Sequence, residues 1–409
     1  MKRIDFEHGT VTGNILGAAL PMLVAQILSL LYNIVDRVYI ARIPEVGTAA
    51  LGAVGLCFPL IVIITAFSNL FGSGGAPLFS IERGKNDQKK AERIMNTSYS
   101  MVCVCAVILM VIGFLFARPL LTLFGAVCTN GLMSALNTSA DIFADASLYL
   151  RVYVFGLLFL FIYNVCTGIF NAMGDSRTPL FLLILSSVGN VILDVVFVAI
   201  LHWGVAGVAW ATFIAQGASG VFAFFLLMCR VRTFDTGHHF ILFAPEMLRR
   251  LTNYAIPSIA QQSFVSVGNL IIQYYVNLCG PTVIAGFSVA NRINMFALTC
   301  CMSFASGLSS YVAQNIGARK LDRVGPGLKA GGTFSVGLGI VFMMIYLPLA
   351  NRIISLFLPA GSASGVVDVA RGYLFTVVPF YVVVCIKFVC DSVLRGAGAM
   401  RPFMITTFS

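Results

Sequence analysis

Long apolar runs follow one another along almost all of this 409-residue chain, and they constrain its fold more than any other feature. A hydrocarbon core about 30 Å thick requires roughly 20 helical residues per crossing. Backbone polar groups inside that core are satisfied only in helices or closed barrels. Charged residues make up 10% of the chain, against about a quarter of a soluble domain. The chain is therefore predicted to be an all-α polytopic membrane protein.

Ten complete spans and the start of an eleventh are predicted from these runs. They cover approximately residues 15–40, 51–81, 94–117, 148–172, 180–201, 205–229, 254–278, 284–316, 331–350 and 373–394, with the eleventh starting at 402–409. The 11 cysteines lie mostly inside these runs without metal-ligand spacing, and they are interpreted as small buried apolar residues.

The basic residues behind the net charge of +10 lie in short loops between the apolar runs. Cytoplasmic loops of membrane proteins retain an excess of Lys and Arg. With the N-terminus inside, about 18 of these residues lie in the cytoplasm and about five outside. The sequence thus predicts a multi-pass protein of the cell membrane with a cytoplasmic N-terminus. The location of the basic residues in short loops between apolar runs argues against a nucleic-acid partner.

The second half of the chain repeats the first at an offset of about 236 residues. The paired positions are Leu20-Pro21 with Ile256-Pro257, Gln26 with Gln262, Asn33 with Asn269, and Tyr39 with Tyr275. Six spans precede the second copy, so both copies enter the membrane from the same side. This predicts a parallel repeat of two pseudo-symmetric six-helix lobes.

The repeat also predicts the domain boundaries. We expect an N-lobe at residues 1–230, a cytoplasmic linker at 231–252 and a C-lobe at 253–409. The second copy ends soon after Arg401-Pro402, so the equivalents of the fifth and sixth spans, about 45 residues, are expected to be missing. The second lobe is then incomplete, and the chain is interpreted as truncated or as an incomplete sequence.

Polar side chains inside the first lobe form a candidate cation site, because charges in the bilayer are expensive and mark functional positions. Asp36 lies late in the first span, and Asn190 and Asp194 share one face of the fifth. Thr212 lies in the sixth. Their oxygens suit Na⁺, or a carboxylate could carry a proton instead. Hydrogen bonding between helices alone is the alternative.

The second lobe does not repeat these acids, since Asp36 aligns with Ile272. Its candidates for lining a substrate cavity are Gln262, Asn269, Arg292, Lys387 and Asp391. The last two lie one helical turn apart, so an internal ion pair that neutralises both is the simpler interpretation. Arg292 could contact an anionic substrate or cap backbone carbonyls.

Enzyme chemistry is not indicated. The sequence contains no phosphate loop, no Ser-His-Asp arrangement and no metal-ligand spacing beyond the possible Na⁺ site. We therefore expect no enzyme, no cofactor and no direct ATP drive. Transport coupled to an ion gradient is the remaining interpretation.

These features together resemble the multidrug and toxic compound extrusion (MATE) family, part of a larger group that includes lipid-linked oligosaccharide flippases. The shared motifs are Pro21 followed by Asp36, the Asn190-x-x-x-Asp194 pair, GVAGVAWAT ending at Thr212, and FNAMGDSRTP with its weaker copy VLRGAGAMRP. The resemblance covers the whole chain. It implies two six-helix lobes around a V-shaped cavity that exports organic, often cationic compounds in exchange for Na⁺ or H⁺.

The resemblance also implies roles for single residues. Asp36, Asn190, Asp194 and Thr212 match the family's N-lobe cation site, and Pro21 matches the proline at which the first span bends. Where some members carry acids in the seventh and tenth spans, this chain has Gln262 and neutral residues near Val384. A second cation site in the C-lobe is therefore not expected.

Two other functions remain open from the sequence. A flippase for lipid-linked saccharides needs several cations for its phosphates, and the spans offer only Arg292 and Lys387, with Arg37 near one end. The second alternative is that the chain is a truncated remnant that does not transport. The leading prediction is a monomeric multidrug antiporter whose partners are small organic compounds and the lipid bilayer.

Overall fold

The computed structural model describes residues 4–41, 57, 60, 61, 64, 68, 75–121, 140–232, 243–357 and 364–408. These residues are almost entirely helical and include no strand. Eight of their helices are long and apolar enough to cross a membrane, or nine if one bent pair counts as a single span. The predicted all-α membrane fold is confirmed.

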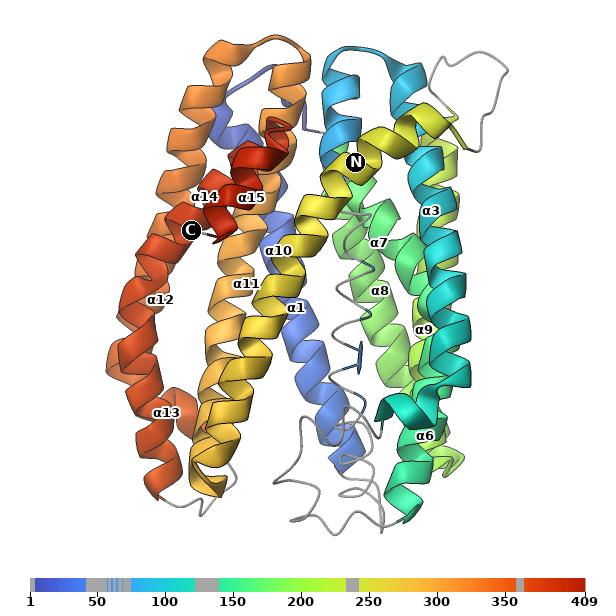
Figure 1. Ribbon diagram of the computed structural model, residues 1–409, viewed down its shortest axis with the longest axis vertical. Coiled ribbons are helices and arrows are strands. Elements are labelled where there is room, and N and C mark those ends of the chain that lie inside the picture. The colour runs from blue at the N-terminus through green and yellow to red at the C-terminus, as the bar shows by residue number, and fades with distance from the viewer. Residues whose placement is uncertain are drawn as a thin grey trace.

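The helices of the first half are α1 (Val11–Ala41), α3 (Gln88–Leu115), α6 (Ala140–Phe155), α7 (Leu157–Ala172), α8 (Arg177–Asp194) and α9 (Gly204–Val231), with a π-helix η1 (Val195–Ile200) after α8. Those of the second half are α10 (Pro245–Leu278), α11 (Pro281–Gly317), α12 (Val324–Phe357), α13 (Ser364–Val377), α14 (Tyr381–Gly396) and α15 (Met400–Phe408), with 3-10 turns η2 (Leu321–Arg323) and η3 (Val378–Phe380). Figure 1 shows the two halves as neighbouring bundles.

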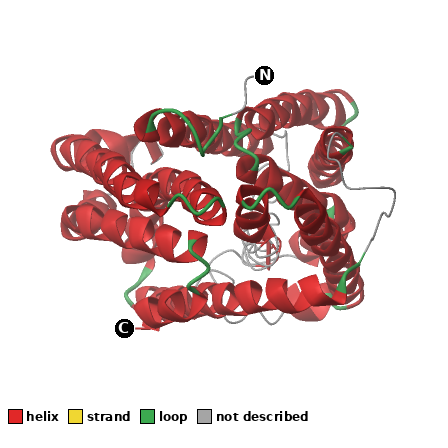
Figure 2. Ribbon diagram, turned by 90° about the horizontal axis from the view of Figure 1, so that it is seen from above, coloured by secondary structure: helices red, strands yellow, loops and turns green. Residues whose placement is uncertain are grey.

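Two helices connect the bundles on opposite faces. Helix α1 packs against α8 of the first half and against α11 and α12 of the second. Helix α10 begins beside α3 and packs further along on α15 and α11. Seen from above in Figure 2, one long helix lies along the edge of the molecule and spans both bundles. The contact between halves is thus made mainly by the first helix of each repeat.

Nine predicted spans correspond to helices or to broken helices. The predicted second span, residues 51–81, lies mostly outside the described residues. The fourth bends by 50° between α6 and α7, at Gly156. The tenth is interrupted by η3, which contains Pro379 and separates α13 from α14, because a proline cannot donate the next helical hydrogen bond.

Local hydrogen bonds fix the helix starts on the basic side. Asp87 caps α3 by accepting from the Lys90 amide at 3.0 Å. Its hydrogen bonds to Lys90 lower the pKa of the Asp87 carboxyl. Asp175 accepts from the Thr178 amide at 3.2 Å at the start of α8 and from Arg230 at 3.2 Å. This second carboxylate therefore ties the beginning of α8 to the end of α9.

The backbone repeats as well as the sequence. Gly174 in FNAMGDSRTP has φ +76°, and Gly398 in its copy VLRGAGAMRP has φ +75°. Asn86 and Arg319, which follow the helices that end at the two basic loops, both have φ 59°. Left-handed values are uncommon for residues other than glycine. Their recurrence at paired positions supports the internal repeat.

The two halves cross at one end in direct backbone contact. A Cβ on Gly84 would collide with the carbonyl oxygen of Gln314 in α11, and a Cβ on Gly317 would collide with that of Ile81. Both glycines end helices that lead into basic loops. The face of the molecule that carries these basic loops, called the basic face from here on, is therefore closed where Gly84 and Gly317 meet. We call this contact the glycine crossing.

Close packing within the N-lobe gives a first prediction. A Cβ on Gly220 of α9 would lie 2.7 Å from the carbonyl oxygen of Phe159 in α7. We expect Gly220→Ala to lower the stability by about 1–3 kcal/mol, because the helices must separate. A Cβ on Gly337 of α12 would meet no atom within 4 Å, so Gly337→Ala is the matched control. Thermal unfolding in detergent measures both, and equal melting temperatures would contradict the prediction.

Candidate functional site

Two polar side chains of the fifth span are buried in the N-lobe. Asn190 is 1% exposed and Asp194 is 2% exposed, both on α8. Their spacing of four residues places them on one helix face. That helix packs against α1 and α9, as Figure 1 shows. A carboxylate held among three apolar helices in a membrane span is the strongest candidate for a functional group in the described chain.

The helix changes its winding at this carboxylate. Asp194 is the last residue of α8, and the π-helix Val195–Ile200 begins directly after it. The amide of Leu201 donates to the carbonyl of Val196 at 2.9 Å, five residues back. Single π turns inside helices occur frequently at functional sites. The apolar sequence pattern did not predict this π turn.

The π turn is fixed by its neighbours at the end of the span. The rings of Phe197 and Trp203 stack with centroids 5.0 Å apart, and the Trp203 amide donates to the Phe197 carbonyl at 2.9 Å. His202 with φ 54° and Gly204 with φ 57° then turn the chain into α9. Gly204 is the only signal of this turn that the sequence offered.

Thr212 lies on α9, which packs against α8. Its side chain is half-buried, and its hydroxyl donates to the Val208 carbonyl at 3.0 Å. The hydroxyl oxygen thereby keeps its lone pairs for other partners. Thr212 therefore lies on the helix that packs against the one carrying Asn190 and Asp194, and its participation in a cation site stays a prediction.

The remaining N-lobe candidates lie on α1. Asp36 belongs to the helical backbone of α1, but its side chain lies outside the described residues. Pro21 lies inside the same helix, which runs from Val11 to Ala41. The bend at Pro21 and the participation of Asp36 in the site both stay predictions.

The predicted cavity residues of the C-lobe are scattered over three helices. Gln262 and Asn269 are exposed on α10, and Arg292 is exposed on α11. On α14, Lys387 Nζ lies 2.6 Å from Oδ2 of Asp391, with side-chain exposures of 43% and 8%. The ion pair inferred from their spacing is present, and it neutralises a carboxylate that would otherwise be buried alone.

The N-lobe candidate side chains offer carboxylate, amide and hydroxyl groups. Carboxylate, amide and hydroxyl oxygens are the hard ligands that Na⁺ takes. Within the described residues, no group of three or more His, Cys, Asp or Glu side chains could hold a metal ion. A single buried carboxylate with neutral oxygen donors also suits a proton.

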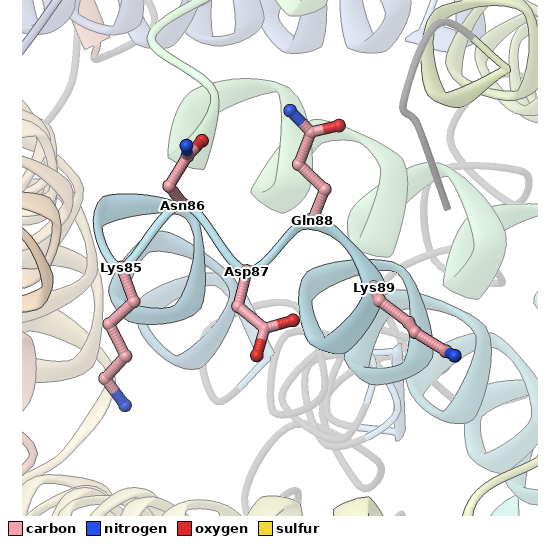
Figure 3. Close-up of a pocket in the computed structure, with 5 residues that line it drawn as sticks. All are labelled: Lys85, Asn86, Asp87, Gln88 and Lys89. Atoms are coloured by element: carbon pink, nitrogen blue, oxygen red, sulfur yellow. The ribbon is translucent and has the colours of Figure 1, made fainter. Parts of the chain in front are cut away.

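A separate hollow of about 450 Å³ lies at the basic face, in the turn before α3. Figure 3 shows the side chains of Lys85, Asp87 and Lys89 pointing to one side and those of Asn86 and Gln88 to the other. Two of these residues already pair within the turn region, Lys85 with Glu82 at 2.9 Å and Asp87 with Lys90 at 2.7 Å. We assign no ligand to this hollow.

Apolar helices in two repeated halves, with buried polar groups inside the spans, define a polytopic membrane protein. The chain belongs to the MatE family, whose model matches residues 21–196 and 257–409. The two matched segments begin at Pro21 and Pro257, the paired prolines of the repeat.

Two relatives of the chain are named as multidrug resistance or multidrug export proteins. The chain is 25% identical over 411 residues to the probable multidrug resistance protein YpnP of Bacillus subtilis (strain 168), covering 99% of this chain and 87% of that protein. It is 24% identical to the multidrug export protein MepA of Staphylococcus haemolyticus (strain JCSC1435), covering 86% and 75%.

Solved structures of the family share the fold. One described as the outward-facing conformation of a multidrug resistance MATE family transporter of the MOP superfamily gives a TM-score of 0.87. The sequences are 21% identical, and the comparison covers 100% of this chain and 87% of that one. At this identity the likeness supports the fold alone.

Proposed function

We propose that this protein is a secondary active exporter of organic, often cationic compounds, driven by antiport of Na⁺ or H⁺. It would act as a monomer in the cell membrane, with its basic face and N-terminus in the cytoplasm. The observation that carries the proposal is the buried Asp194 with Asn190 on α8. The names of the multidrug relatives support the substrate class.

The position of α1 supports a coupling mechanism. This helix packs on α8, which carries the carboxylate, and on α11 of the other half. A cation that binds Asp194 from outside would alter the packing of α8 on α1, and α1 would transmit the change to the contact between the halves. The cation must bind the two states with different affinity, because equal affinity shifts no equilibrium.

The proposal is tested by ethidium efflux from vesicles that contain the protein, with a Na⁺ gradient or a pH gradient imposed separately. We expect efflux under one gradient only, which identifies the coupling ion. Asp194→Asn and Asp36→Asn should reduce that efflux to the rate of empty vesicles, since an amide neither takes up a proton nor carries the charge that holds a cation.

Asp368 is exposed on α13, so Asp368→Asn is the matched control for the same chemical change away from the site. It should transport at the wild-type rate. Full efflux by Asp194→Asn at equal protein content would refute coupling through this carboxylate. An absence of efflux by folded wild-type protein under both gradients would refute the export of this cation.

A further inference from the structure

Residues 4–9, which precede α1, bind the first half of the molecule. The amide of Ile4 donates to the carbonyl of Gly174 at 3.1 Å, in the turn between α7 and α8. The approach is so close that a Cβ on Gly174 would collide with the Ile4 carbonyl oxygen. The left-handed glycine of the repeat motif therefore provides the space in which this segment lies.

The same six residues also bind the second half. Nδ2 of Asn315 on α11 donates to the Phe6 carbonyl at 3.1 Å. Nζ of Lys320 donates to the Glu7 carbonyl at 3.0 Å, and Nη2 of Arg323 donates to the Gly9 carbonyl at 3.0 Å. Three backbone carbonyls of the segment are thus held by three side chains of the second half.

A buried aromatic anchors the segment between these contacts. Phe6 is 0% exposed and packs edge to face on Tyr311 of α11, with centroids 6.0 Å apart. Its cluster also includes Ile15 of α1 and Val389 of α14. Burial of a phenylalanine ring contributes about 1.5–3 kcal/mol. The segment is therefore an integral part of the packing at this face.

His8 adds a contact that depends on its tautomer. Nδ1 lies 2.8 Å from Oδ2 of Asp5, and Nε2 lies 3.3 Å from Nζ of Lys320. A neutral ring that donates from Nδ1 to Asp5 leaves Nε2 free to accept from Lys320. Asp5 thereby orients the imidazole toward the second half.

All of these contacts lie beside the glycine crossing. Asn315 follows Gln314, whose carbonyl faces Gly84, and Lys320 and Arg323 follow Gly317. A motion that separates the halves at the crossing must carry Gly174 away from Asn315, and the segment between them must then release one side. The contacts therefore oppose opening of the basic face.

We propose that residues 4–9 form a clasp that holds the basic face closed, and that each transport cycle requires its release from α11. The clasp rests on the proposed transport function, since only a protein that opens at this face needs to release it. Whether the clasp is bound or released can be measured without a transport assay.

The test is hydrogen–deuterium exchange of the full chain in lipid nanodiscs. The double substitution Lys320→Gln with Arg323→Gln replaces the two cationic donors to the clasp with shorter, neutral amide side chains, which reach the Glu7 and Gly9 carbonyls less well. We expect exchange of residues 75–90 and 310–323 to become about tenfold faster, equivalent to about 1.4 kcal/mol. Exchange of residues 201–207 and 280–286, at the opposite face, should become slower because that face closes when the basic face opens.

Lys89 and Lys329 are exposed on the same face outside the clasp, so Lys89→Gln with Lys329→Gln is the matched control and should leave exchange unchanged. Phe6→Ala tests the clasp from its other side, and Phe6→Met, which retains most of the volume, should restore slow exchange. Faster exchange at both faces would mean general destabilisation and would overturn the proposal, as would no change.

Failure of the clasp and failure of the transport function are distinguishable. Unchanged exchange in the variants, together with ethidium efflux by the wild type, overturns the clasp alone. Opposite changes at the two faces without efflux support the clasp while overturning the proposed export of that substrate.

Discussion

Replacement of Gly317 by alanine is expected to reduce export by about five- to 150-fold while leaving the protein folded. The added methyl group would collide with the carbonyl oxygen of Ile81 at the glycine crossing. Backbone atoms on both sides leave no flexible side chain to move aside, so the two helix ends must separate. Overpacking of this kind costs about 1–3 kcal/mol. A cost of that size changes a conformational equilibrium by about five- to 150-fold.

The cost applies only to the state in which the basic face is closed. Gly317→Ala therefore favours the state open at that face, and the proposed transport cycle should slow because it must pass through the closed state. Ethidium efflux and hydrogen–deuterium exchange of residues 75–90 measure the two effects. Gly325 of α12 has open space around it, so Gly325→Ala is the control, and wild-type efflux by Gly317→Ala would show that the crossing need not close.

The second large effect is expected at Glu82, whose side chain is 3% exposed at the same face. Its Oε1 accepts from Lys85 at 2.9 Å and from Arg250 at 3.2 Å. Arg250 lies on α10, so the carboxylate joins the first half to the first helix of the second. Among the described residues, Oε2 has no hydrogen-bond partner, and the burial of this charge depends on the two cations.

Glu82→Gln should shift the equilibrium toward opening of the basic face by about five- to 30-fold, equivalent to one or two kcal/mol. The expected shift of the equilibrium is modest for a buried carboxylate, because its partners Lys85 and Arg250 are half-exposed and stay solvated. Exchange of residues 243–254 at the start of α10 measures it. Glu92→Gln on α3 removes an acid without this contact, and equal exchange in both variants would contradict the prediction.

Much of the fold follows from patterns that a single sequence contains. Apolar runs of 20 or more residues predicted the spans, because the bilayer thickness fixes their length. The four-residue spacing of Lys387 and Asp391 predicted their ion pair, because residues at that spacing are neighbours on a helix. The same rule placed Asn190 and Asp194 on one face of α8, which the structure buries against its neighbours.

The features that the sequence did not predict depend on packing between distant segments. The bend at Gly156 has no proline to indicate it. The π turn after Asp194 follows an ordinary apolar sequence. Residues 5–9 have the polar composition of a solvated terminus, and their partners lie more than 300 residues away. No local pattern records such contacts.

The glycine crossing has one more consequence, for how substitutions combine. Gly84 and Gly317 face each other across a single contact, since a Cβ on Gly317 would also lie 3.1 Å from Cα of Gly84. Once one added methyl group has widened that contact, the second enters space already opened. The free-energy costs at the two positions are therefore non-additive, and the double variant should be scarcely worse than either single one. The two halves of the chain thus share one energetic unit at this face.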